Sequence, residues 1–261
     1  MAENIRQAYP RASRILGRAA RSQGGEELAL YEQFFKGTRN GSFVEMGALD
    51  GLHFSNTAAF ERVLGWRGVL IEANPTVCPA LWANRPLATC LCTAASGDYS
   101  GIQMEKGTNT ATFGEVAQMD DRFRSETHRH VGRFKQYTVP SAPLGHLLRM
   151  VGVSQIDLFS LDVEGAEYKV LQTFDWTIPV RVWCIEVKSS NRSEQIGALM
   201  RGHGYVRREW ATKAAHARAV LADNELWVWD NETELVRGFG VGRFRWSMYE
   251  PSRLGRKNAV S

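Results

Sequence analysis

Carboxylates lie at or just after the ends of nearly all the apolar strands that this 261-residue sequence predicts. They are Glu45, Glu72, Asp98, Asp162, Glu164 and Glu186. In a parallel sheet the carboxyl ends of the strands meet at one edge, and ligands bind there. A carboxylate is costly beside a buried strand unless it binds something. The pattern therefore indicates a ligand site at that edge and favours a ligand with positive charge.

The loop after the first of these strands is rich in glycine, but it reads E-x-G-x-x-x-G rather than G-x-G-x-x-G. Gly47 would let the backbone approach a ligand closely, and Gly51 would open the next helix. Glu72 ends the second strand, where an acidic side chain can hold ribose hydroxyls. Because Glu45 would repel a pyrophosphate, the pattern disfavours a dinucleotide. It favours a cationic nucleoside that carries an amino acid, S-adenosylmethionine, and hence methyl transfer.

Four segments carry a family resemblance: FVEMGALDGLHFSNT, LGWRGVLIEANP, IDLFSLDVEGAEYKVL and VRVWCIEV. They resemble the successive motifs of FkbM-type methyltransferases, a branch of the class I enzymes that use S-adenosylmethionine. The resemblance spans about residues 22–230, and D-V-E-G-A-E after an apolar strand is its most distinctive part. It implies a seven-stranded sheet with a reversed last strand, and O-methylation, often of sugar or polyketide hydroxyls.

The resemblance also implies which residues hold the methionine end of the cofactor. The residues that would line the methionine portion and the sulfonium are Glu45, Gly47, Ala48 and Gly51. Asn56 would face the cofactor from the first turn of the following helix.

For the nucleoside end, the resemblance implies that Glu72 holds the ribose. The residues implied around the adenine are Ala73, Asn74, Ala95 and Ser96, with Asp98 beside them. Asp162 would lie near the transferable methyl. The family often has lysine two residues before that aspartate, where this chain has Ser160, which weakens the transfer of the family's substrate preference but not of its cofactor.

Transfer to an aliphatic hydroxyl requires a general base or a metal, because such a hydroxyl is a poor nucleophile. Asp162 and Glu164 are the leading catalytic candidates, since both follow the central strand. Glu164 could instead cap the next helix or pair with an arginine. His53, just after the cofactor loop, is a third catalytic candidate, and its alternative is a surface-loop histidine.

A divalent metal is conceivable because Asp162, Glu186 and Asn191 follow adjacent strands and offer oxygen ligands suited to Mg²⁺ or Ca²⁺. Hydrogen bonds within the protein explain the same residues, and we favour a site without metal. The irregular stretch of about 96–137 should shape the acceptor site. Its basic residues are Arg122, Arg124, His128, Arg129, His130 and Arg133, which could engage an anionic substrate or form a solvated mixed-charge segment.

Apolar runs and helical periodicities alternate along the chain and predict a doubly wound, Rossmann-like α/β fold with a mostly parallel seven-stranded sheet and helices on both faces. The predicted strands are 43–46, 68–71, 88–93, 156–163, 180–187, 205–210 and 225–230. The predicted helices are 26–36, 58–63, 77–82, 144–151 and 166–174, with a further helix that a capping box at Asn191-x-x-Glu194 should open. The irregular stretch should hold a short hairpin and a helix.

The charge divides the chain into a methyltransferase domain, 23–236, and two basic tails. The whole chain carries +4, but residues 1–22 carry +4 and residues 237–261 carry +5, which leaves about −5 for the domain. A small-molecule or glycan acceptor is the expected partner. The tails could instead bind nucleic acid or an anionic membrane face, or dock the chain as a cofactor-binding but non-catalytic subunit of an assembly.

The remaining composition indicates an ordinary globular protein without a membrane span. No apolar run reaches the length that crosses a bilayer, and residues 1–22 lack the apolar centre of a secretory signal. The four cysteines, Cys78, Cys90, Cys92 and Cys184, form no C-x-x-C pair. We therefore expect reduced thiols and a cytoplasmic protein.

Overall fold

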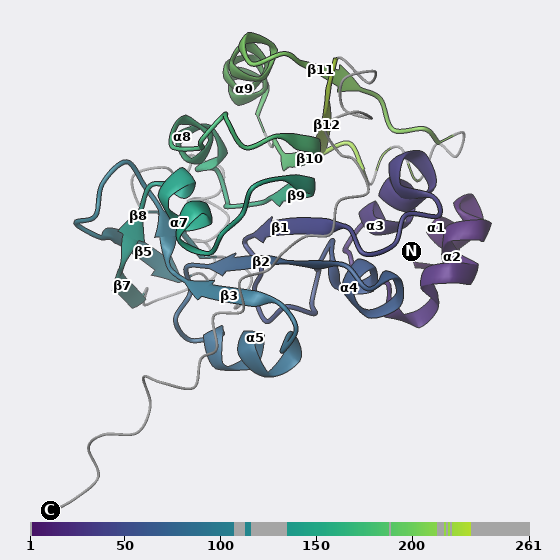
Figure 1. Cartoon of the computed structure of the whole chain (residues 1–261), viewed down its shortest axis with the longest axis horizontal. Coiled ribbons are helices and arrows are strands. Elements are labelled where there is room, and N and C mark those ends of the chain that lie inside the picture. The colour runs from purple at the N-terminus through teal and green to yellow at the C-terminus, as the bar shows by residue number, and fades with distance from the viewer. Residues whose placement is uncertain are drawn as a thin grey trace, which may run out of the picture.

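A seven-stranded sheet forms the centre of the molecule (Figure 1). The computed structural model describes residues 2–106, 113–115, 135–187, 189–212, 217, 219 and 221–230. The strand order is β11-β12-β10-β9-β1-β2-β3. The bounds are β1 (Ser42–Met46), β2 (Arg67–Glu72), β3 (Thr89–Cys92), β9 (Ile156–Leu161), β10 (Val180–Glu186), β11 (Tyr205–Arg208) and β12 (Asn224–Trp229).

The strands pair as the sequence predicts. β3, β2, β1, β9 and β10 are parallel, and β12 runs antiparallel to both β10 and β11. The chain order reverses between β1 and β9, so the loops after these two strands diverge and leave room for a ligand at the carboxyl edge. The doubly wound fold with a reversed strand is thus confirmed.

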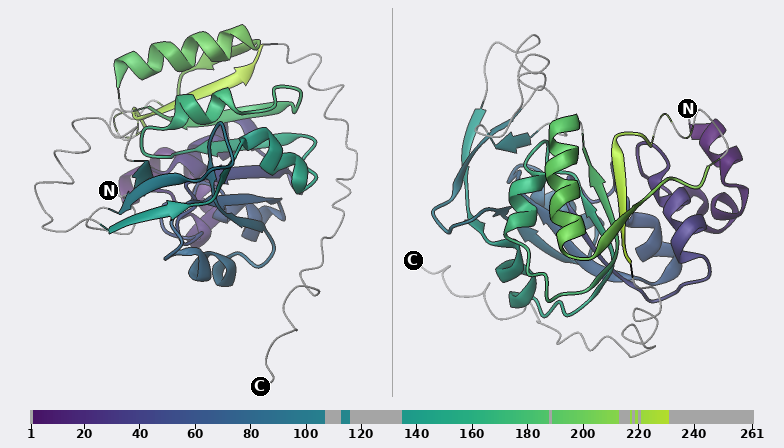
Figure 2. Two further views of the ribbon diagram at one scale, coloured as in Figure 1. Left: turned by 90° about the vertical axis from the view of Figure 1, so that its left-hand side faces the viewer. Right: turned by 90° about the horizontal axis from the view of Figure 1, so that it is seen from above.

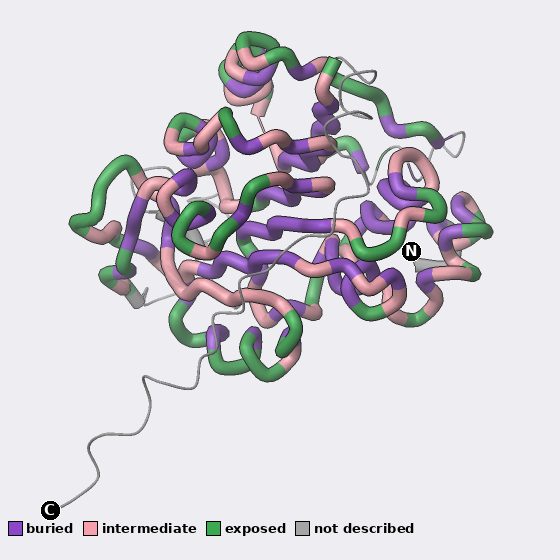
Figure 3. The backbone as a smooth tube through the Cα atoms, in the orientation of Figure 1, coloured by how far each residue is buried: buried purple, intermediate pink, exposed green. Residues whose placement is uncertain are grey.

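Helices cover both faces of the sheet because side chains alternate along each strand. On one face, Phe43 and Leu158 pack with the helices α3 (Glu26–Leu30), α4 (Ala58–Leu64) and α5 (Cys78–Asn84) and a π-helical turn, η2 (Tyr31–Phe35). On the other face, Val44 and Phe159 pack with α7 (Leu144–Met150), α8 (Glu167–Gln172) and α9 (Ser190–Gly202). Figure 3 shows the buried residues concentrated along the central strands.

The basic leader is packed against this domain. It forms α1 (Ala2–Ala8), α2 (Pro10–Leu16) and η1 (Gly17–Ala19), beside α3 in Figure 1. Both helices and the residue between them contribute to the core: Ile5, Tyr9, Ala12 and Leu16 are all at most 3% exposed. The predicted division of the chain after residue 22 stays a prediction. The C-terminal tail lies outside the described residues.

Two small sheets follow β3. One pairs β4 (Ala94–Ala95) with β8 (Ser141–Ala142), and the other has the antiparallel order β6-β5-β7, with β5 (Ile102–Lys106), β6 (Phe113–Glu115) and β7 (Lys135–Val139). Figure 2 shows β5 and β7 at the end of the molecule remote from α1 and α2. The hairpin expected here is present. The predicted cluster of arginines and histidines, residues 122–133, lies outside the described residues.

Two expectations are wrong. Cys78 and Cys92 form a disulfide, so only Cys90 and Cys184 are free thiols. The pair meets because α5 returns the chain from β2 to β3, which places the start of α5 beside the end of β3. The capping box is also wrong: Ser189, not Asn191, caps α9 and accepts the backbone N–H of Arg192.

Among the described residues, no helix combines the length and the apolar character needed to span a membrane.

Candidate functional site

The end of β1 lies directly against the end of β9. A Cβ atom added to Gly47 would be 1.8 Å from the carbonyl oxygen of Asp162, and Gly47 has a φ of +84°. Only glycine fits both conditions. Backbone N–H groups of Gly47 and Ala48 donate to the carbonyl of Ile71, which ties the loop to β2 as well. The predicted loop residues therefore lie at the switch point of the sheet.

Glu45 lies beneath this loop and holds its far end. Its carboxylate accepts hydrogen bonds from the Asn56 N–H and the Ser55 hydroxyl, at 2.7 and 2.8 Å, and from the Thr57 hydroxyl. The side chain is 4% exposed. Its oxygens bind residues 55–57, so Glu45 supports the loop from the interior of the protein. Its predicted contact with the cofactor stays a prediction.

Arg85 completes this support, and the sequence analysis missed it. Its guanidinium is fully buried, donates to the carbonyl of Gly51 and the hydroxyls of Ser55 and Thr57, and pairs with Glu61 at 3.1 Å. Glu45 lies 3.8 Å away. A single arginine after α5 has no periodic signal, and its burial becomes visible only when α5 lies against the loop.

Glu72 reaches the loop from the end of β2. Its two carboxylate oxygens accept the N–H groups of Leu49 and Asn74, each at 2.7 Å. Burial raises the pKa of Glu72. Hydrogen bonds from these two amides and from the Ala73 amide partly oppose the rise, and the negative charge of Asp162 reinforces it. Glu72 thus joins the loop after β1 to the loop after β2, where the ribose was predicted.

Two buried amide atoms at this edge have no hydrogen-bond partner among the described residues. One is Nδ2 of Asn74, whose Oδ1 accepts from Thr76. The other is Oδ1 of Asn56, whose Nδ2 donates to the Ser160 hydroxyl at 2.9 Å. Buried polar atoms are normally satisfied, so an orphaned donor and an orphaned acceptor here fit a polar ligand. Both residues were predicted to face the cofactor.

The remaining predicted adenine residues follow β3. Ala95 is buried in β4, and Ser96 donates its backbone N–H to Ala142. Asp98 is exposed, and hydrogen bonds from Ser100 lower its pKa. The structure places these residues at the carboxyl end of the strand next to β2, as predicted.

The loop after β9 carries the leading catalytic candidates. Asp162 is exposed, and Glu164 is half-buried with a φ of +54°, followed by Gly165 at +100°. A non-glycine residue in the left-handed region costs energy and is often found at functional sites. The two carboxylates therefore flank a tight turn rather than share a strand face.

His53 lies in the loop after β1 with its ring mostly exposed. Its Nδ1 is 2.5 Å from Oδ2 of Asp50, whose other oxygen accepts the N–H groups of Leu52 and His53. Burial opposes the shift, but the His53 ring and these amides together lower the pKa of Asp50. His53 is on the same edge of the sheet as Asp162.

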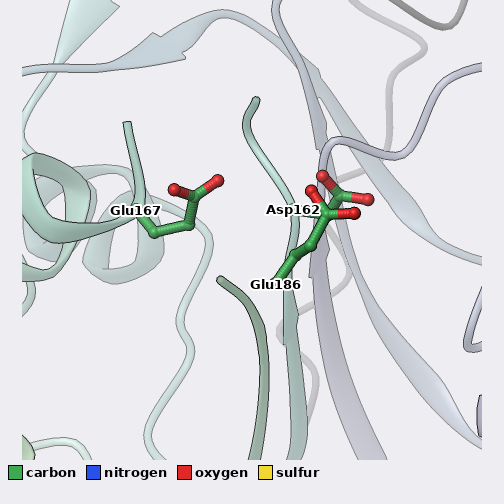
Figure 4. Close-up of side chains that lie close together, drawn as sticks. All are labelled: Asp162, Glu167 and Glu186. Carbon is green, nitrogen blue, oxygen red and sulfur yellow. The ribbon is translucent and has the colours of Figure 1, made fainter. Parts of the chain in front are cut away.

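Three carboxylates meet between β9, β10 and α8 (Figure 4). Oxygens of Asp162, Glu167 and Glu186 all lie within 4.8 Å of one another. The third member of this cluster is Glu167. The third metal ligand considered from the sequence, Asn191, is exposed on α9. Burial raises the pKa of Glu167 to about 7. Its Oε1 accepts the N–H groups of residues 163 and 165, so Glu167 acts as a support for the turn after β9, and we assign no metal here.

One family model matches the sequence. The model of the Methyltransferase FkbM domain matches residues 45–218, which are 174 of the 261 residues. No curated protein matches the chain in sequence.

Two solved structures with similar folds are both distant in sequence. Aeropyrum pernix fibrillarin with natively bound S-adenosyl-L-methionine is 14% identical, with a TM-score of 0.42 over 79% of this chain and 74% of that chain. An O-methyltransferase from Bacillus cereus in complex with SAH is 11% identical, with a TM-score of 0.38 over 86% and 88%. Likenesses of this size carry no argument about substrate. The family match covers more than half of the sequence, and the chain therefore belongs to the FkbM methyltransferase family.

Proposed function

We propose that this chain binds S-adenosylmethionine at the carboxyl edge of β1 and β2 and transfers its methyl group to a hydroxyl of a small molecule or glycan. The observation that carries the proposal is the pair of orphaned amide atoms, on Asn56 and Asn74, on either side of the loop that Gly47 and Glu72 hold in place.

The residues present fit this cofactor. The loop from Gly47 to Gly51 would lie along its methionine portion, and Glu72, whose carboxylate keeps lone-pair capacity beyond its amide bonds, would accept a ribose hydroxyl. Asn74 would receive the adenine with its unpaired Nδ2. When bound, S-adenosylmethionine supplies a methyl group already activated by a sulfonium.

The protein then has to align the acceptor and remove its proton. Asp162 suits the second task, because it is exposed at the end of the central strand and its carboxylate can take a proton from a hydroxyl placed there. Glu164 and His53 are the further candidates. The acidic edge favours a neutral polyol as acceptor over a phosphorylated one, since carboxylates repel phosphate.

Calorimetry with S-adenosylhomocysteine tests the cofactor site. We expect binding to the wild type, and a roughly 10- to 100-fold weaker affinity for Glu72→Ala, because each lost hydrogen bond to a charged group is worth about 1.5–3 kcal/mol. Glu194→Ala, an exposed glutamate on α9, is the matched control. Wild-type affinity in Glu72→Ala would place the ribose elsewhere, and no binding by the wild type would remove the proposal.

Transfer itself is tested with S-adenosylmethionine tritiated at the methyl group and a panel of free hexoses, methyl glycosides, RNA and DNA. Label in a sugar supports O-methylation of a hydroxyl. Label in nucleic acid alone would make nucleic acid the acceptor instead of a small molecule or glycan. Asp162→Asn should lower the turnover of the labelled acceptor more than it lowers the affinity for S-adenosylhomocysteine.

A further inference from the structure

The disulfide lies beside the predicted nucleoside site. Cys78 begins α5 and is four residues beyond Asn74, and its Sγ is 3.4 Å from the Asn74 carbonyl oxygen. Cys92 ends β3 in register with Glu72, and the N–H of Thr93 donates to the Glu72 carbonyl. The bridge therefore joins the start of α5, which follows the loop 73–77, to the end of β3, which pairs with the strand that precedes this loop.

Apart from the bridge, a backbone hydrogen bond from the Leu81 N–H to the Val77 carbonyl joins this loop to α5. Within it, the Asn74 N–H donates to Glu72, and Oδ1 of Asn74 accepts from the N–H and hydroxyl of Thr76. These bonds are local to residues 72–76. The covalent bond from Cys78 to Cys92 ties the start of α5 to the sheet, with Cα atoms 6.2 Å apart.

We propose that the Cys78–Cys92 disulfide is a redox-sensitive clamp on the nucleoside loop, which binds cofactor tightly when oxidised and weakly when reduced. This inference rests on the proposed function, because it takes Glu72 and Asn74 as the ribose and adenine residues.

The reducing step requires a dithiol reductant. A thiolate of the dithiol attacks the half-buried Sγ of Cys92, since Cys78 is only 3% exposed, and the Sγ–Sγ bond breaks with Cys78 as leaving group. The second thiol of the reductant then displaces Cys92 and forms the oxidised reductant. The protein gains two electrons and two protons as two thiols, and a small-molecule disulfide reverses the exchange.

A third cysteine on the same strand does not scramble the pairing. Cys90 is two residues from Cys92, so the two side chains share a face of β3. Burial raises the pKa of Cys90 to about 11, with Arg85 opposing and Glu61 reinforcing the shift. Because the thiolate is the attacking species, Cys90 is a poor nucleophile at neutral pH and leaves the switch to an external thiol.

The first test counts thiols in the full-length protein. After treatment with glutathione disulfide and unfolding, maleimide labelling read by mass spectrometry should modify Cys90 and Cys184, and after dithiothreitol it should modify all four cysteines. Four labelled cysteines in the oxidised protein would overturn the proposal.

The second test measures the affinity for S-adenosylhomocysteine in both redox states. We expect the reduced protein to bind at least fivefold more weakly. Cys78→Ser should bind like the reduced wild type in both states, and the control Cys184→Ser, which keeps the bridge, should bind like the wild type in each. Equal affinities in the oxidised and reduced wild type would overturn the clamp.

Amide hydrogen exchange separates this inference from the proposed function. The amides of Asn74 and Thr76 should exchange at least fivefold faster after reduction, whether or not cofactor binds. If S-adenosylhomocysteine binds in neither state, the proposed function fails, while unchanged exchange of these amides refutes the clamp itself.

Discussion

Replacing Gly47 with alanine tests the most crowded point of the proposed site. The added Cβ would lie 1.8 Å from the Asp162 carbonyl oxygen, far inside contact distance, and neither atom can rotate away, because the oxygen belongs to the backbone and the backbone fixes the Cβ. β1 and β9 would have to separate at their carboxyl ends. We therefore expect the substitution to lower both the free energy of unfolding and the cofactor affinity.

The size of the effect follows from two contributions. An alanine at a φ of +84° costs about 1–2 kcal/mol. Displacement of Gly47 also weakens two hydrogen bonds, from Gly47 N to Ile71 O of β2 and from Asp162 N to Met46 O between β9 and β1, at about 1 kcal/mol each. The total is about 3–4 kcal/mol.

Gly152→Ala is the matched control, because Gly152 has a φ of +74° and no atom within 4 Å of an added Cβ. It should lose only the conformational cost, about 1–2 kcal/mol, and keep its affinity for S-adenosylhomocysteine. Urea unfolding and calorimetry on both variants decide the matter. If Gly47→Ala matches Gly152→Ala in both measurements, the close approach of the two strand ends is not what requires glycine.

Three further predictions concern other parts of the structure. Leu16→Ala should lower the free energy of unfolding in urea by about 2–5 kcal/mol if the leader belongs to the core. Arg11→Ala, at an exposed position of the leader, should leave it nearly unchanged. Equal and small effects of the two substitutions would make the leader a separate tail. Arg85→Met should cost about 3–5 kcal/mol, because it leaves buried carboxylates without their cation, and unchanged stability would contradict that pairing. Burial raises the pKa of Glu27 to about 8, so the native state keeps a proton that the unfolded state loses, and the free energy of unfolding should fall as pH rises from about 4.5 to 8. Glu27→Gln should flatten that slope in urea titrations across the window; the same slope in the variant would assign it to other groups.

The fold could be predicted because its signals are local. Apolar runs such as 156–163 and 180–187 correspond to β9 and β10 within two residues at each end. Their continuous burial distinguishes them from amphipathic strands and indicates a sheet covered on both faces. The reversal of β12 followed from the absence of a helical pattern between it and β11.

The site could be predicted only in outline. Glu72 and Asn74 follow β2 directly, so their place was visible in the sequence. The network below the loop was not visible in the sequence, because Glu45 and Arg85, which lie 3.8 Å apart, are separated by 40 residues along the chain. Side chains that end a strand can face either a ligand or a neighbouring loop, and spacing alone does not separate these outcomes.

The disulfide could not be predicted from the sequence for a similar reason. Pairing requires Cα atoms within about 7 Å, and a sequence separation of 14 residues does not specify that distance. It depends on the path of α5 across the edge of the sheet. The cap of α9 is a simpler case, in which Ser189 and Asn191 were both acceptable residues and the backbone of Ser189 was extended.

The packing of the leader has a consequence for how the chain folds during synthesis. The helices α1 and α2 leave the ribosome before the rest of this domain, but the core that they join also contains Leu226 and Val228 of β12. Hydrogen bonds from Asn224 to Glu26 and from Gln33 to Glu209 span 198 and 176 residues. The core that buries these helices is therefore complete only when almost the whole domain has emerged, although α2 also contacts α3 and α4. Until then, part of the apolar surface of α1 and α2 lacks its native partners, and a chaperone would have reason to cover it.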